Sequence, residues 1–431
     1  MRRIFLVGLL AVMGIFLFSA GVRWGWFVAA ERIPEPDPSE EEVQAPVQPE
    51  PEEEPEPEPE PQPEPDLRTV NLIAAGDITA HLPQITQAHI GDGKYDFSPS
   101  FEIIAPHLQA ADLVVGNLET CQAGTEISFL GYQGYTGYPC FNAPIDLSVA
   151  LKQAGFDLVA TAHNHSMDRG LAGLKATLEN IRSVGLTAFG THLSEQERDT
   201  PVIAEVNGVN IGFLAYTFST NVIPVPQGHE YAVNFIEDFH TLDPIIDEIG
   251  RATDAGADLV AVYMHWGPMY VTEPPPHLRD LARDLATAGA DLILGGHPHV
   301  TQPMEWFHTE REDGSTRVSL ATYSMGNFLS NQRYPANPTD LVQYGKILKI
   351  EITKDMDRDE TWISDVGYDI TWVHRLWGHR ILSLSEVLAG DPSDFNLDPA
   401  QVEELRLGYL RHEQIIGKYG FFEGSPETRG D

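Results

Sequence analysis

The chain has 431 residues, of which 42% are hydrophobic, and carries a formal net charge of −37. It is long enough for one large folded domain or two ordinary ones, with enough apolar material for a sizeable core. The acidic balance excludes nucleic acid as an expected partner, because phosphate binding requires clustered Lys and Arg.

The amino-terminal segment predicts a membrane anchor. Residues 4–22 form an uncharged apolar stretch long enough to cross a bilayer, and Arg2 and Arg3 before it favour a cytoplasmic amino end. The alternative is a signal peptide cleaved near residues 28–30, which would release a secreted protein. We therefore expect a single-pass protein of the cell membrane whose folded domain is extracytoplasmic, with secretion after signal cleavage as the alternative.

Composition divides the chain into four segments. Residues 31–66 consist almost entirely of Pro, Glu, Gln and Asp, which predicts an extended, disordered spacer that cannot bury enough apolar surface to fold. The four predicted segments are an anchor or signal at 1–30, the spacer at 31–66, the main domain at 67–375 and a C-terminal helical extension at 376–431.

From Thr69 onward, apolar runs of strand length alternate with segments of helical period, which predicts an α/β fold with much parallel pairing. The continuous apolar runs are typical of sheets that are covered on both faces. The expected strands are 69–75, 112–116, 157–161, 210–216, 258–264, 291–295, 318–324 and 347–353. The expected helices are 147–155, 171–185 and 276–289, followed by one within 391–420.

Polar side chains gather directly after five of these strands. Because the carboxyl ends of strands form the ligand crevice of open α/β sheets, we expect these side chains to converge. Carboxylates and imidazoles together suit Mn²⁺, Fe²⁺ or Zn²⁺, and a bridging carboxylate can hold two such ions about 3.5–4 Å apart. The sequence therefore predicts a site for two divalent metal ions. The residues concerned are Asp77, Asn117, Glu119, His163, Asn164, His165, Asp168, His265, His297 and His299.

Several of these residues also have an ordinary structural interpretation. A single His at a strand end is more often a hydrogen-bonded structural residue. Asp77 could cap the turn after its strand, and Asn164 and His165 could fix their loop by side-chain to backbone bonds. Asp168 and Arg169, directly before Gly170, are expected to start the next helix. The spacing of His297 and His299, one residue apart, and the agreement of the other clusters favour metal ligands.

The chain contains two cysteines, Cys121 and Cys140. In an oxidising compartment they are expected to form a disulfide that closes a loop of about twenty residues. Two free thiols are the alternative. The sequence around them has no Cys pattern of a metal site.

Six short motifs follow one another along the chain: GD at 76–77, NLET at 117–120, HNHSMDRG at 163–170, HWG at 265–267, GGHPHV at 295–300 and YSMGNF at 323–328. In order and spacing, from about residue 69 to 375, they resemble the CapA family. That family is named for poly-γ-glutamate capsule synthesis and belongs to the calcineurin-like metallophosphatase superfamily. The resemblance implies a four-layer α/β/β/α sandwich of the metallophosphatase type, with a dinuclear metal centre at one end.

The resemblance also implies roles for single residues. It implies six ligands: Asp77 and His299 on the first ion, Glu119 between the ions, and Asn164, His265 and His297 on the second. His165, directly after Asn164, occupies the position of the superfamily's catalytic histidine. Four further residues are expected to support the ligands from nearby: His81, Asn117, His163 and Asn327.

The first motif departs from the superfamily pattern. The superfamily has Asp-x-His, whereas Thr79 stands at the position of the histidine in this chain. This substitution predicts a weak first metal site unless His81 supplies the missing imidazole. The second motif has Glu119 where the superfamily has Asp, as in CapA proteins.

The function implied by the resemblance is that of an extracytoplasmic, membrane-anchored hydrolase that cleaves a phosphoester with metal-bound hydroxide. It would act in the biosynthesis of capsule, poly-γ-glutamate or another cell-envelope polymer. The expected partners are the bacterial membrane, through the N-terminal helix, and an envelope polymer or phosphoester substrate. The alternative is a non-enzymatic accessory protein for the assembly, export or retention of an anionic surface polymer. An acidic domain without a basic cluster would repel such a polyanion unless metals offset the charge.

Overall fold

The computed structural model describes residues 65–236, 241–311 and 314–424. The chain divides into two units, Met1–Gln62 and Pro63–Asp431, and every described residue belongs to the second. The apolar stretch 4–22 lies outside the described residues, as does the predicted spacer up to residue 64. Within the described ranges, no helix combines the length and the apolar character needed to cross a membrane.

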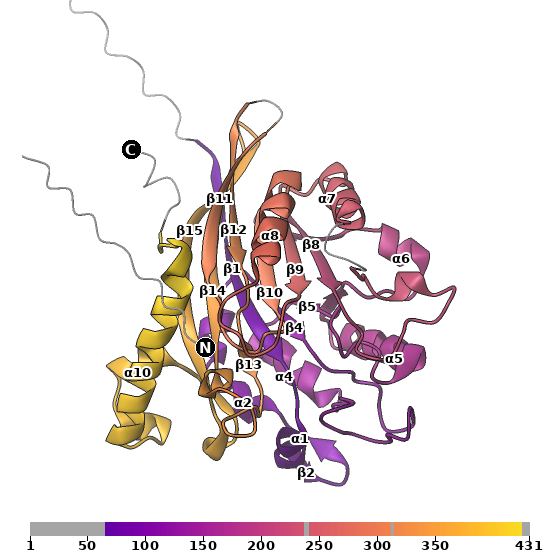
Figure 1. Cartoon of the computed structure of the whole chain (residues 1–431), viewed down its shortest axis with the longest axis vertical. Helices are drawn as coiled ribbons and strands as arrows, with labels where there is room; N and C mark the ends of the chain where they lie inside the picture. Colours follow the sequence, from indigo (N-terminus) through magenta and orange to yellow (C-terminus); the bar gives the residue numbers. More distant parts are fainter. Residues whose placement is uncertain (1–64, 237–240, 312–313, 425–431) are drawn as a thin grey trace, which may run out of the picture. The chain divides into compact units, whose positions relative to one another are not determined.

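The larger sheet has eight strands among the described residues and mixes parallel with antiparallel pairing (Figure 1). Its central strand β1 (Leu67–Ile78) runs parallel to β4 and antiparallel to β14. The carboxyl ends of β1, β4 and β5 therefore lie at one edge. The strand order is β16 (Arg380–Ser383), β15 (Glu360–His374), β14 (Tyr344–Asp355), β1, β4 (Leu113–Leu118), β5 (Leu158–Ala160) and β6 (Thr187–Phe189), with β13 (Asn327–Leu329) paired to the end of β1.

The smaller sheet has six strands in the part of the chain that the structure describes. Its central strands β8, β9 and β10 are parallel, so their carboxyl ends also share one edge. The order is β11 (Met304–Glu310), β12 (Thr316–Thr322), β10 (Leu292–Gly296), β9 (Leu259–His265), β8 (Val209–Thr217) and β7 (Val202–Val206). A separate short pair is formed by β2 (His89–Gly91) and β3 (Lys94–Tyr95).

Three apolar cores show how the layers pack. Along β1, side chains alternate between the two faces of the sheet. Val70, Leu72 and Ala74 belong to a core that both sheets share, whereas Ile73 and Ala75 face a second core with helices. A third core lies between the smaller sheet and its own helices. The order of layers is therefore helices, larger sheet, smaller sheet, helices.

Six of the described helices cover the outer faces of the two sheets. The outer face of the larger sheet carries α1 (Leu82–Ala88), α2 (Ser98–Phe101), α3 (Ala105–Gln109) and α4 (Asp146–Ala154). The smaller sheet is covered by α7 (Asp243–Asp254) and α8 (Pro276–Ala288). The remaining helices are α5 (Gly170–Ser183), α6 (Glu195–Asp199), α9 (Leu384–Ala389) and α10 (Pro399–Ile416), of which α10 lies beside β14 and β15 in Figure 1.

The predicted α/β class is confirmed, and each of the eight expected strands overlaps an observed strand. The tail after residue 376 contains a strand as well as helices, because β16 pairs with β15 and extends the larger sheet. The sequence did not indicate β15, whose alternating polar and apolar residues differ from the continuous apolar runs of the parallel strands.

The predicted disulfide is wrong, since Cys121 and Cys140 are both free thiols. The main chain places Cys121 opposite a different residue: the Ala143 N–H donates to the Cys121 carbonyl oxygen at 2.8 Å. The Cys121 thiol instead faces the carbonyl oxygens of His165 and Ser166, at 3.4 and 3.6 Å. Burial raises the pKa of Cys121 to about 12, which keeps this thiol protonated and unreactive.

Candidate metal centre

Strands from both sheets end at one place and carry polar residues there. In the larger sheet, Asp77 of β1 pairs in register with Asn117 of β4 and with Asn327 of β13. In the smaller sheet, Gly296 at the end of β10 pairs with His265 at the end of β9. Convergence at the strand ends was expected from the sequence. The structure adds that two different sheets contribute to it.

Asp77 links the two sheets directly. The main-chain N–H of His297 donates to Asp77 Oδ2 at 3.0 Å. The close approach requires Gly296, because a Cβ at that position would lie 2.5 Å from Asp77 Oδ1. His297 and His299 have φ values of 92° and 58°, a region that non-glycine residues rarely occupy and that clusters at functional sites.

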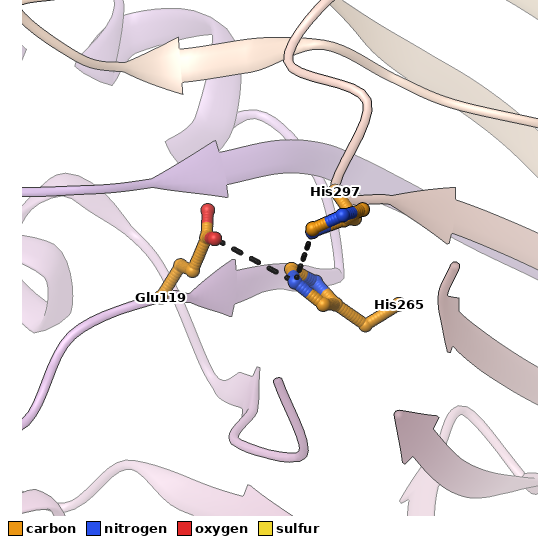
Figure 2. A group of neighbouring side chains, drawn as sticks. All are labelled: Glu119, His265 and His297. Carbon is orange, nitrogen blue, oxygen red and sulfur yellow. Dashed lines mark hydrogen bonds and ion pairs between the residues drawn. The ribbon is translucent and has the colours of Figure 1, made fainter. Parts of the chain in front are cut away.

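One group of possible ligands consists of Glu119, His265 and His297 (Figure 2). The His265 Nε2 atom lies 3.5 Å from Glu119 Oε1 and 3.1 Å from His297 Nδ1. Asn164 Oδ1 lies 3.0 Å from the same His265 nitrogen. Four side chains, from both sheets, thus point toward one small volume.

A second group consists of Asp77, Glu119 and His299. The His299 Nδ1 atom lies 3.5 Å from Asp77 Oδ2 and 3.8 Å from Glu119 Oε2. Glu119 therefore belongs to both groups, with Oε1 facing one and Oε2 facing the other. This is the arrangement of a carboxylate that bridges two ions.

The donor atoms fit a divalent cation in number, type and spacing. Atoms bound at about 2.1 Å to one ion lie roughly 3.0–3.4 Å from each other, which is close to the separations around His265. Glu119 Oε1 is buried and has no hydrogen-bond partner among the described residues, although a buried carboxylate oxygen normally has one. Imidazole nitrogens with carboxylate oxygens suit Mn, Fe or Zn.

The electrostatics of the site favour added positive charge. Burial, together with Asp77, raises the pKa of Glu119 to about 7. Burial alone would lower the pKa of His299, but Glu119, Asp77 and Asn327 outweigh it and raise the pKa to about 9. Two buried carboxylates side by side thus attract a proton to His299, and a cation would meet the same demand.

The other two imidazoles are held neutral. Burial lowers the pKa of His265 and of His297 well below the ordinary value, and neighbouring histidines act in the same direction. A neutral imidazole is the form that binds a metal ion.

His165 lies next to the centre and is oriented by a carboxylate. Its Nδ1 atom is 2.8 Å from Asp168 Oδ2, and both side chains are buried. The Phe141 ring packs against the His165 ring at 4.6 Å, and the Phe141 N–H donates to the same Asp168 oxygen. Helix α5 begins at Gly170 as expected, and of the two residues before it Arg169 holds the N-cap position without a side-chain bond. The Asp168 carboxylate does not cap the helix and contacts His165 instead.

Two expected supporting residues contact the ligands. Asn117 Nδ2 donates to Asp77 Oδ1 at 2.8 Å and lies 3.2 Å from His265 Nδ1. Asn327 Oδ1 lies 3.1 Å from His299 Nδ1, and Asn327 Nδ2 donates to main-chain carbonyls, including that of His299. Asn117 thus contacts the His265 nitrogen remote from Glu119, whereas Asn327 contacts the same His299 nitrogen that faces Asp77 and Glu119.

The other two expected supporting residues lie further back. The His163 Nδ1 atom accepts the His165 N–H at 3.1 Å, so His163 shapes the loop that carries the catalytic candidate. His81 Nε2 lies 3.2 Å from Ser330 Oγ, and His81 belongs to neither ligand group. Thr79 takes a different part: its hydroxyl donates to Glu119 Oε2 at 3.0 Å.

The sequence left several contributors unassigned. Local sequence patterns place Asp168 at a helix start, and they do not indicate the hydrogen bond from Thr79 to Glu119. Asn221, 57 residues from Asn164, exchanges hydrogen bonds with it. Tyr263 has a buried hydroxyl without a hydrogen-bond partner among the described residues, and burial, Asp77 and Glu119 raise its pKa well above the ordinary value. The HNHSMD spacing was the only sequence signal available for the His165–Asp168 contact.

Comparison with known proteins assigns the chain to a family. A family model described as "Bacterial capsule synthesis protein PGA_cap" matches residues 71–332. "Capsule biosynthesis protein CapA" of Bacillus anthracis is 30% identical over 258 residues, 58% of this chain and 58% of that protein. "PGA biosynthesis protein CapA" of Bacillus subtilis (strain 168) is 30% identical over 252 residues, 57% of this chain and 60% of that protein. The matched part thus spans less than two thirds of either relative's length.

Solved structures with a related outline are more distant. One, described as a novel phosphatase from Mycoplasma pneumoniae, has a TM-score of 0.39 and 13% identity over 78% of this chain and 99% of that chain. Another, the sulfate thiohydrolase SoxB from Thermus thermophilus, has a TM-score of 0.37 and 12% identity over 82% of this chain and 62% of that chain. Neither likeness assigns a reaction. The family match is sufficient by itself: the chain belongs to the bacterial capsule synthesis family PGA_cap.

Proposed function

We propose that this member of the capsule synthesis family is a metal-dependent hydrolase that cleaves a phosphoester in the biosynthesis of capsule or another cell-envelope polymer. The observation that carries the proposal is Glu119, whose two carboxylate oxygens face two separate ligand groups. A purely structural carboxylate would be expected to have both oxygens bonded to donors, yet Oε1 has none among the described residues.

The chain's own residues divide the work of binding. Asp77, Glu119 and His299 would hold one divalent ion, and Asn164, His265 and His297 with Glu119 would hold the other. Ions in such a pair neutralise the charge of a phosphoryl group and activate water. Asn117 contacts His265 at Nδ1 and restricts the ring so that Nε2 faces Glu119. His299 Nδ1 would exchange its contact with Asn327 Oδ1 for the ion.

His165 is the proposed general acid. Asp168 holds the His165 ring through Nδ1, which leaves Nε2 as the atom that can give a proton to the leaving oxygen. Phe141 packs edge-on against the ring and restricts its rotation. The pair of His165 and Asp168 therefore has the properties of a histidine whose orientation is fixed for proton transfer.

The setting of the reaction is also part of the proposal. We place the domain outside the cytoplasm, anchored through residues 4–22, and assign its layered sheets to the metallophosphatase type. The names of the two CapA relatives support a place in capsule biosynthesis. The substrate would be a phosphoester of that pathway's polymer or of another envelope component.

Metal content tests the proposal first. The purified full-length chain is expected to hold about two equivalents of Mn, Fe or Zn by elemental analysis, in line with a two-ion site. A His297→Ala/His299→Ala variant is expected to lose them without unfolding, as judged by circular dichroism. Metal-dependent hydrolysis of bis(p-nitrophenyl) phosphate should disappear in the same variant.

The contrary outcome favours the second candidate function. The absence of an imidazole at position 79 leaves the first group with three ligand residues, Asp77, Glu119 and His299, and this favours a reduced or non-catalytic centre. If the chain binds no transition metal even when Mn²⁺ or Zn²⁺ is supplied, the hydrolase is excluded. A non-enzymatic accessory role in polymer assembly, export or retention then becomes the better account.

A further inference from the structure

A large pocket adjoins the candidate metal centre. Its cavity volume is about 970 Å³, comparable to the sites that enclose small organic ligands. The walls come from the end of β8, the segment after it, residues 233–235 and α7, together with the side chains of Arg198 and Glu230. None of the six proposed metal ligands lines it, so it is a separate cavity.

Two wall residues also contact the centre. The Phe218 ring packs against the His297 ring at 4.9 Å. Asn221 Nδ2 donates to the Asn164 carbonyl oxygen at 2.8 Å, and the Asn164 amide donates to Asn221 Oδ1 at 3.3 Å. Asn221 Nδ2 also lies 3.5 Å from His165 Nδ1. A molecule in the pocket therefore lies against side chains that contact two proposed metal ligands, His297 and Asn164, and the proposed acid His165.

Part of the pocket wall is polar and hydrogen-bonded. Glu248 of α7 is buried, accepts a short hydrogen bond from the Tyr216 hydroxyl, and accepts a second bond from Asn234 Nδ2 at 3.2 Å. Arg198 and Arg251 both lie near enough to act electrostatically on Glu248. A carboxyl group and two guanidinium groups thus meet in one cavity.

The two arginines differ in how they are used. Arg198 is exposed and donates from Nε and Nη2 to Asp199 next to it. Arg251 Nε is buried and has no hydrogen-bond partner among the described residues. A buried guanidinium N–H without an acceptor is costly, and an anionic oxygen is the acceptor that such groups bind best. Arg251 is therefore the group in this pocket that calls for a ligand.

The surroundings of Arg251 restrict the charge of that ligand. Three acidic residues, Glu230, Asp247 and Glu248, line the same cavity and would repel a phosphate dianion. Phe218, Phe235 and three valines supply apolar walls that suit an organic body. A single carboxylate on an organic molecule matches both features.

We propose that this pocket binds the carboxylate arm of an organic substrate, with Arg251 as the partner of the carboxylate. The inference rests on the proposed function in one respect: the remainder of the same molecule extends past Phe218 and Asn221 to the metal centre. Arg251 is then a specificity-determining residue, at least 14 residues distant in sequence from every proposed metal ligand and on a different element from each.

The test is calorimetric titration of the full-length chain with monomethyl glutarate, which carries one carboxylate, and, separately, with inorganic phosphate, in a buffer that contains a chelator. Wild-type protein binds monomethyl glutarate, and Arg251→Met weakens that binding at least tenfold. Arg406→Met is the matched control, because Arg406 is an exposed arginine of α10 that pairs with Glu403. His265→Ala keeps monomethyl glutarate binding, because His265 is outside the pocket.

Different failures identify different errors. Absence of monomethyl glutarate binding, or equal binding by a folded Arg251→Met variant, overturns the pocket assignment whatever the metal content. Phosphate binding that depends on Arg251 as strongly as monomethyl glutarate binding does overturns the choice of a carboxylate. Monomethyl glutarate binding by a chain that takes up no metal leaves the pocket assignment in place and excludes the hydrolase. If Arg251→Met does not fold, Arg251→Lys replaces it, because Lys keeps the charge without Nε and should also weaken binding.

Discussion

The hydroxyl of Thr79 is predicted to set the affinity of the first ligand group. It donates to Glu119 Oε2 at 3.0 Å, and both side chains are almost completely buried. Thr79→Val replaces the hydroxyl with a methyl of similar size, so the change removes one hydrogen bond and little packing. Loss of a residue that orients a metal ligand typically lowers affinity by about 10–100-fold. We expect a loss of that order for one of two equivalents of Mn²⁺.

The other equivalent should be affected less. His265 and His297 do not depend on Thr79, and they face Glu119 Oε1 rather than Oε2. Isothermal titration with Mn²⁺ separates the two events, and Thr79→Ser should restore the lost affinity because it restores the donor. In the metal-free protein, Thr79→Val leaves the buried Glu119 Oε2 atom without its donor, which should lower the free energy of unfolding by about 1–3 kcal/mol.

A matched control is available in the same chain. Thr125 donates to Glu126 Oε1 at 3.2 Å, but this Thr–Glu pair is exposed and distant from the ligand groups. Thr125→Val should change neither Mn²⁺ affinity nor stability by a measurable amount. If Thr79→Val binds two equivalents of Mn²⁺ as tightly as wild-type protein does, Glu119 is held by other contacts and the Thr79 hydroxyl does not set the affinity of the first ligand group.

Three further predictions concern other parts of the fold. Asp168→Asn should lower kcat by about 10²-fold or more with intact metal content, because His165 loses its orienting carboxylate; unchanged kcat would remove the dyad from the mechanism. Glu248→Gln should become more stable relative to wild type as pH rises. Burial raises the folded-state pKa of Glu248 to about 7. The stability contributed by its protonated form is present below the unfolded pKa and lost as pH rises through the folded pKa. The gain should therefore reach about 2–3 kcal/mol between about pH 5 and pH 8 in denaturant titrations, and a pH-independent difference would contradict it. Chelation should lower the thermal midpoint of wild-type protein and leave that of His297→Ala/His299→Ala unchanged. Metal at 100 times its Kd should add about 2.7 kcal/mol to the free energy of unfolding, which chelation removes.

The sequence predicted elements best where burial on both faces leaves a simple signal. β4, β9 and β10 are buried along their whole length and read as continuous apolar runs. β15 packs one face on the core and leaves the other partly exposed, so its pattern alternates and no apolar run marks it. β13 has three residues, too few for any periodicity to indicate a strand. Strands that are buried on both faces are therefore easier to predict from the sequence than strands that are exposed on one face.

Contacts between distant segments explain what the sequence could not give for the site. A local capping rule assigned Asp168 to the helix that follows, because the rule considers only neighbouring residues. The competing partners, His165 and the Phe141 N–H, are brought to Asp168 by the loop before α4 and the turn after β5. The same limit applies to Asn221, whose contact with Asn164 joins the two sheets. The disulfide prediction was wrong for a related reason. A disulfide requires a particular distance and orientation of the two cysteines, which their spacing in the sequence does not determine.

The division of ligands between two sheets has a consequence for how the site can form. The larger sheet supplies Asp77 and Glu119, and the smaller sheet supplies His265, His297 and His299. Each ligand group contains members from both sheets, so neither group exists until the sheets have packed. The hydrogen bond from His297 N to Asp77 Oδ2 fixes their relative position at the point where the ions would bind. A cation in either group would therefore act as a further cross-link between the sheets, beside their shared apolar core and these hydrogen bonds, and metal binding and sheet packing should stabilise each other.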